Sequence, residues 1–255
     1  MGCGSIKDRL HISTIDADAR ELALKNGVGL EIADFCWAMY MDCGRESHIA
    51  ASAEKARGID SKWFHAPFAE LAACAIDPKV LELTRERYLD SISIAAQLGI
   101  NRVVIHGGYI PYVYFPEHYV EQSVEFWRTL LPRLPENIVI ALENVMEPDP
   151  TMLIRIVEGV GDDRMGLCFD AGHANCEISS MLPMEWIDPM APYLKHVHLH
   201  NNLGKKDMHA SLNEGTIPME ALIDRIVSLA PNATFTIENQ HSLHSLEWLA
   251  SLGYI

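Results

Sequence analysis

The chain alternates short, apolar, β-rich runs with longer segments whose apolar residues recur at helical spacing. Among the helical segments, residues 79–99 are the clearest, and Gly99 stands where a helix C-terminus is expected. A second helix fits residues 117–131, and a third, 149–161, opens with an Asp-Pro pair suited to a helix start. We expect strands at residues 9–14, 28–33, 62–66, 102–107, 138–144, 164–170, 194–200 and 234–239.

A regular strand–helix alternation predicts a parallel sheet, because each helix carries the chain back to start the next strand in the same direction. Eight such units in 255 residues predict an α/β protein with one (β/α)8 TIM barrel domain over residues 1–255. A doubly wound sheet is the second interpretation.

Composition narrows the class further. The chain has no apolar run near the roughly 18 residues of a membrane helix, and its N-terminus lacks a signal-peptide pattern. Gly2 fits a myristoylation signal but Ile6 does not, so we expect a cytoplasmic protein. Six cysteines without a CxxC motif, Cys3 among them, indicate buried thiols. The net charge of −15 argues against a nucleic-acid partner.

Candidate chemistry gathers where the predicted strands end, which is where TIM barrels carry their active sites. The strand ends supply only carboxylates and imidazoles: His65, His106, Glu143, Asp170 with His173, His198 and Glu238, and the loop after the seventh strand adds Asp207 and His209. Any one of them alone is best explained as a hydrogen-bonded core group, but six consecutive strands ending this way are not. Oxygen and imidazole donors without thiolates suit Mn²⁺, Fe²⁺, Co²⁺ or Zn²⁺.

The motifs "LEN", "DAGH", "HVHLHNN", "DMHASLNEGTI" and "IEN" carry a family resemblance. The chain resembles the xylose isomerase-like TIM barrel superfamily, which includes sugar-phosphate isomerases and epimerases, sugar dehydratases and endonuclease IV. The resemblance implies one divalent metal site, with Glu143 and Glu238 also transferring protons. The implied ligands are Glu143, Asp170, His198 and Glu238. Similarity to endonuclease IV implies further ligands for a second or third ion, at His65, His106, His173, Asp207 and His209.

The histidines of "LKHVHLHNN" share one face of the seventh strand but differ in depth. We expect His196 to be a core residue, His198 to be the metal ligand level with Asp170 and Glu143, and His200 to reach the rim and contact substrate.

The first functional hypothesis is an isomerase or epimerase that moves a proton next to a carbonyl of a small sugar, sugar phosphate or polyol, through a metal-stabilised enediolate. His173 and His200 would orient hydroxyl groups, and Trp37 and Tyr109 would form aromatic walls, although ordinary loop packing also explains these aromatics. The alternatives are a polyol dehydratase, an endonuclease IV-like phosphodiesterase acting on abasic DNA, and a barrel that only binds its ligand. We expect no nucleic-acid or membrane partner, and a homo-oligomer stays open.

Overall fold

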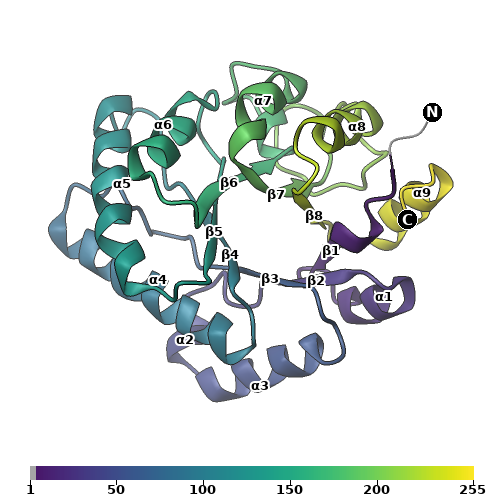
Figure 1. Cartoon of the computed structure of the whole chain (residues 1–255), viewed down its shortest axis with the longest axis horizontal. Helices are drawn as coiled ribbons and strands as arrows, with labels where there is room; N and C mark the ends of the chain where they lie inside the picture. Colours follow the sequence, from purple (N-terminus) through teal and green to yellow (C-terminus); the bar gives the residue numbers. More distant parts are fainter. Residues whose placement is uncertain (1–3) are drawn as a thin grey trace.

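Each run assigned to a strand is a strand in the computed structural model, which describes residues 4–255. The strands pair in parallel and in chain order, and β8 pairs with β1 to close the barrel (Figure 1). The prediction of a (β/α)8 barrel is therefore confirmed. The strands are β1 (Leu10–Ser13), β2 (Gly29–Ile32), β3 (Lys62–His65), β4 (Arg102–His106), β5 (Val139–Glu143), β6 (Met165–Asp170), β7 (Leu194–Leu199) and β8 (Thr234–Ile237).

Helices surround this barrel, and each strand is followed by at least one of them (Figure 1). They are α1 (Ala19–Asn26), α2 (Met39–Asp42), α3 (Arg45–Ala56), α4 (Pro78–Gln97), α5 (Pro116–Leu130), α6 (Thr151–Val160), α7 (Pro183–Met190), α8 (Met219–Leu229) and α9 (Leu243–Ser251). Within residues 4–255, no helix has both the length and the apolar character needed to cross a membrane. The expectations made on Gly2 and Cys3 fall outside the described residues.

Local sequence sets the helix ends close to where the pattern predicts them. At the start of α4, Asp77 Oδ1 accepts a hydrogen bond from the main-chain N–H of Lys79 (2.7 Å), and Pro78 occupies the first turn. The helix ends at Gln97, and Gly99 follows with a φ of 70°. Helix α6 begins at Thr151, whose main-chain N–H donates to Asp149 Oδ1 (2.8 Å), and it ends before Gly161.

Strand register places the polar strand ends side by side. His106 on β4 pairs with Glu143 on β5, and Asp170 on β6 pairs with His198 on β7. Because parallel neighbours end together, these side chains meet at one mouth of the barrel. The two ends of the described chain also meet, since the main-chain N–H of Ile6 donates to the Tyr254 carbonyl oxygen at 2.9 Å.

Candidate metal centre

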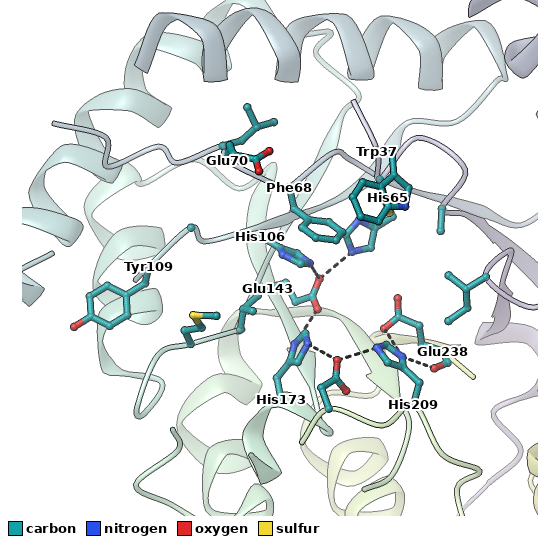
Figure 2. Close-up of a pocket in the computed structure, with 18 of the residues that line it drawn as sticks. Trp37, His65, Phe68, Glu70, His106, Tyr109, Glu143, His173, His209 and Glu238 are labelled. Carbon is teal, nitrogen blue, oxygen red and sulfur yellow. Dashed lines mark hydrogen bonds and ion pairs between the residues drawn. The ribbon is translucent and has the colours of Figure 1, made fainter. Parts of the chain in front are cut away.

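Three groups of carboxylates and imidazoles lie next to one another at the carboxyl ends of the strands, and Figure 2 shows members that line the cavity. The first surrounds one oxygen of Glu143. His65 Nε2 lies 3.2 Å and His106 Nε2 lies 3.4 Å from Glu143 Oε2. Figure 2 shows both rings pointing at this carboxylate from the side of β3 and β4.

The second group surrounds His198, whose ring is fully buried. His198 Nδ1 lies 3.4 Å from Glu143 Oε1, 3.6 Å from Asp170 Oδ2 and 3.4 Å from Glu238 Oε2. Neither ring nitrogen of His198 makes a hydrogen bond of standard geometry among residues 4–255, although Nε2 forms an ion pair with Glu31 Oε1 at 3.1 Å. Ligands arranged tetrahedrally at about 2.1 Å from an ion stand about 3.4 Å apart, which is the spacing seen here. A buried Nδ1 atom without a hydrogen bond, at this spacing from three carboxylates, fits a metal ion.

The third group is centred on Asp207 in the loop after β7. Asp207 Oδ2 lies 2.9 Å from His209 Nε2 and 3.4 Å from His173 Nε2. These two imidazoles hold the pKa of Asp207 below its usual range, although burial opposes that shift. Burial by itself would lower the pKa of His209, but Asp207 and Glu238 raise it to about 9. The third group is therefore an ion cluster that a cation can enter by displacing a proton.

Main-chain carbonyl groups fix which nitrogen of three histidines faces these clusters. A carbonyl oxygen only accepts hydrogen bonds, so an Nδ1 atom bonded to it carries the proton and Nε2 is left as the metal-binding atom. The three pairs are His65 Nδ1 with the Ala66 oxygen (2.9 Å), His173 Nδ1 with the Asn144 oxygen (2.9 Å) and His209 Nδ1 with the Glu238 oxygen (2.8 Å).

Glu31 on β2 belongs to this centre, and sequence reasoning missed it. Its side chain is fully buried, with Oε2 accepting a hydrogen bond from Thr236 Oγ1 (2.8 Å) and lying 3.0 Å from His196 Nε2. Oε1 lies 3.1 Å from His198 Nε2. Burial would raise the pKa of Glu31, but His198 and His196 hold it well below its usual range. The available signal was a charged residue inside the apolar run "VGLEIA".

The histidines of β7 differ in depth, but His200 does not reach the open rim. His196 is buried inside the barrel, where its ring stacks on Trp63 at 4.2 Å and burial lowers its pKa to about 4. His200 is also fully buried, and its Nε2 lies 3.0 Å from both oxygens of Asp170. The loop after β7 returns over His200, because Asn201 bridges to Ala210 and the ring of His209 stacks on His200.

The glycine of "DAGH", Gly172, is needed because it lacks a side chain and not because of its backbone conformation. Gly172 has a φ of −71°, which any residue adopts. A Cβ atom at this position would stand 1.9 Å from Cε1 of His200. Gly172 therefore allows His200 to approach Asp170, while the main-chain N–H of His173 donates to Asp170 Oδ1 at 2.6 Å.

A cavity of ≈ 870 Å³ opens above the donor groups. Its floor includes His65, His106, Glu143, His173, Asp207, His209 and Glu238. The predicted aromatic residues Trp37 and Tyr109 both line it, whereas Asp170, His198 and His200 lie beneath its surface. Across the described part of the chain, the cavity lining contains no lysine or arginine.

Comparison with known proteins places the chain in a family. An uncharacterised protein of Methanocaldococcus jannaschii is 30% identical over 188 residues, which are 69% of this chain but only 64% of that protein. A probable endonuclease 4 of Mycobacterium leprae is 26% identical over 188 residues, which are 69% of this chain and 73% of its own length.

Two solved structures share the fold across almost the whole chain. A D-tagatose 3-epimerase-like protein superposes with a TM-score of 0.79 at 24% identity and 96% coverage of both chains. A protein from Thermus thermophilus, soaked with ZnCl2, gives a TM-score of 0.73 at 27% identity, with 96% of this chain and 97% of the other covered. The family model described as xylose isomerase-like TIM barrel matches residues 39–252. With this match and a closed eight-stranded barrel, the chain belongs to the xylose isomerase-like TIM barrel family.

Proposed function

We propose that the protein is a divalent-metal-dependent isomerase or epimerase of a small sugar or polyol. The observation that carries this proposal is the pair Glu143 and Glu238. Both line the cavity, and both have an oxygen 3.4 Å from His198 Nδ1. Two carboxylates beside one carbonyl-binding position are what proton removal and return require. The epimerase-like structural neighbour supports this choice of substrate class.

The ligands of the principal ion are Glu143, Asp170, His198 and Glu238, with Mn²⁺, Zn²⁺, Co²⁺ or Fe²⁺ as the ion. A bound divalent ion supplies Lewis-acid polarisation of a substrate carbonyl and stabilises the negative charge that develops on its oxygen. The zinc-soaked relative from Thermus thermophilus supports a metal in this fold. A second ion would use His65 and His106 with Oε2 of Glu143, the oxygen near both rings. A third would use His173, Asp207 and His209.

Glu31 has a supporting role in this proposal. Its Oε1 atom faces His198 Nε2 at 3.1 Å, so a proton on Nε2 points at a carboxylate and Nδ1 is left to bind the ion. Thr236 and His196 hold the other oxygen of Glu31 in place. The carboxylate thereby sets the tautomer and the orientation of the ligand ring.

In the reaction, one of Glu143 and Glu238 takes the proton from the carbon next to the carbonyl, and the other returns it. Return to the neighbouring carbon gives isomerisation, and return to the opposite face of the same carbon gives epimerisation. Trp37 and Tyr109 contact the substrate from the cavity wall, and His173 presents its ring at the floor. His200 acts from below, by orienting Asp170.

An endonuclease IV-like phosphodiesterase is the second candidate, favoured by the three donor groups and by the similarity to probable endonuclease 4. It demands that the site accept a polyanion. The cavity lining, as far as the chain is described, holds four carboxylates and no lysine or arginine, and the net charge is −15. DNA affinity comes mostly from cationic groups that neutralise phosphates, so this candidate ranks second.

Solvent exchange tests the proposal. The protein, reconstituted separately with Mn²⁺, Co²⁺ and Zn²⁺, is incubated with a panel of ketoses in deuterated water, and carbon-bound deuterium is measured by NMR. We expect deuterium next to the carbonyl in at least one ketose, and at least a hundredfold slower incorporation by Glu238→Gln. Absence of exchange across the panel, together with metal-dependent cleavage of abasic DNA, would replace the isomerase with the phosphodiesterase.

A further inference from the structure

The wall of the cavity above the donor groups is exposed and apolar. Five large apolar side chains line it while keeping at least about a third of their surface exposed: Ile15 (40%), Trp37 (61%), Val80 (36%), Ile110 (46%) and Met146 (40%). They come from the segments that follow β1 to β5, so they form one continuous side of the opening, whereas the segments after β6 to β8 contribute polar residues to the lining. Exposed apolar surface gathered in a concave site is typical of ligand binding.

Among the described residues, the same wall offers nothing that binds a phosphate. The acidic groups in the cavity are Glu70, Glu143, Asp207 and Glu238, and its basic groups are imidazoles. Recognition of phosphate uses arginine or lysine side chains or several convergent main-chain N–H groups. Lys205 and Lys206 are exposed on the loop after β7 and are not among the residues of the lining. Away from the floor, where the proposed ions would lie, a phosphate would meet Glu70 and apolar surface.

We propose that the substrate is an uncharged sugar or polyol that carries an apolar substituent, such as an aryl or alkyl group, and that it is not a phosphate ester. This inference rests on the proposed function and adds what the substrate bears beyond its reacting carbons. The reacting carbons lie at the floor over Glu143 and Glu238, and the substituent lies against Trp37. A cavity of ≈ 870 Å³ has room for both parts.

Trp37 is the residue through which this preference acts. Trp37 and its neighbour in the chain, Cys36, line the same cavity as His65, and Figure 2 draws Trp37 and His65 in the same part of the view. More than half of the surface of Trp37 is exposed. Covering it with an apolar substituent removes that surface from water, whereas a hydroxyl or phosphate group does not.

Three ketoses that differ only at carbon 6 test the inference: D-fructose, D-fructose 6-phosphate and 6-O-benzyl-D-fructose. Deuterium exchange and calorimetric binding are measured with the metal-loaded protein. We expect the benzyl ether to have a KM about ten- to a hundredfold below that of fructose, the gain typical of burying one apolar side chain. The phosphate ester should be the poorest of the three.

Two variants test whether the cavity wall causes the preference for the benzyl ether. Trp37→Ala should remove most of the gain for the benzyl ether, so that its KM approaches that of fructose. Phe115→Ala is the matched control, because Phe115 is an exposed aromatic (82%) that is not among the residues lining this cavity. Equal preference in wild type and Trp37→Ala, or a better KM for the phosphate ester, overturns the inference.

Binding separates this inference from the proposed function. If none of the three compounds exchanges deuterium, the isomerase proposal fails, and calorimetry still ranks the compounds. Binding in the order benzyl ether, fructose, phosphate ester supports the inference independently of the reaction. Binding of the phosphate ester alone, or of none of the three, rejects it.

Discussion

Glu31 offers the sharpest test of how the barrel holds its metal. We predict that Glu31→Gln weakens binding of Mn²⁺ or Zn²⁺ by about ten- to a hundredfold while the protein still folds. The substitution keeps the shape of the side chain and removes its charge. The main-chain position on β2 and its pairing with β1 and β3 are unchanged.

The magnitude follows from one contact. Glu31 Oε1 lies 3.1 Å from His198 Nε2 in a fully buried site. Losing a charge-assisted contact of this kind costs about 1.5–3 kcal/mol, which corresponds to about ten- to a hundredfold in affinity. Loss of a carboxylate behind a metal-binding histidine typically costs the same factor. We expect the variant to fold, because the Thr236 hydroxyl can rotate and His196 can change tautomer and accept a hydrogen bond from the new amide group.

Metal affinity is measured by competition with a fluorescent chelator, on protein whose fold is checked by circular dichroism. Glu147→Gln is the control, since Glu147 is equally buried but accepts hydrogen bonds from Tyr119 and from the main-chain N–H groups of Val145 and Met146. It should lose stability and keep its metal affinity within twofold. The reasoning is refuted if Glu31→Gln also binds metal within twofold of wild type, or if both variants lose affinity equally.

Three further predictions concern the same centre. Glu238→Ala should lower the metal content measured by elemental analysis, whereas Glu70→Ala, in the same cavity but outside the donor groups, should not; full retention by Glu238→Ala would remove it from the ligand set. In metal-free protein, the pKa of His209 is raised to about 9 from 6.5, so its contribution to stability is complete below about pH 6.5 and is lost as the pH rises through 9. Urea unfolding should then show wild type more stable than His209→Gln by up to about 3 kcal/mol at pH 6 and by little at pH 10, and a constant difference would contradict the shift. Adding Zn²⁺ to chelator-treated protein should raise the unfolding midpoint temperature in a concentration-dependent way, and an unchanged midpoint would argue against a native-state site.

The barrel could be predicted because the evidence for its strands and helices lies in short stretches of the sequence. Periodic apolar runs and helix caps depend on neighbours in the chain, so the strands and the helix around Pro78–Gln97 could be read directly. Polar residues at strand ends could also be found, because the barrel brings the carboxyl ends of its strands together. The role of a residue whose partner lies far away in the chain could not be predicted from the sequence. Glu31, for example, contacts His196, which is 165 residues away in the chain.

His200 shows the second limit of sequence reasoning. Position along a strand gives depth, and it correctly predicts that His196 lies in the core. Depth does not say what covers the strand end. The loop after β7 folds back through the bridge between Asn201 and Ala210, and His200 is buried under it rather than open to a substrate. Such a cover is a tertiary contact that strand periodicity does not encode.

The donor groups and the cavity wall carry different information about function. Carboxylates and imidazoles at this spacing suit an ion for either candidate reaction, because both isomerases and phosphodiesterases use a metal to stabilise negative charge on oxygen. The wall distinguishes them by the charge that the substrate brings. Each carboxylate left without a cation, such as Glu70, would oppose a phosphate about 8 Å away by about 2 kcal/mol at an effective dielectric constant of 20. A neutral substrate meets no such opposition and covers the exposed indole of Trp37, so the wall favours the isomerase where the metal ligands alone do not decide.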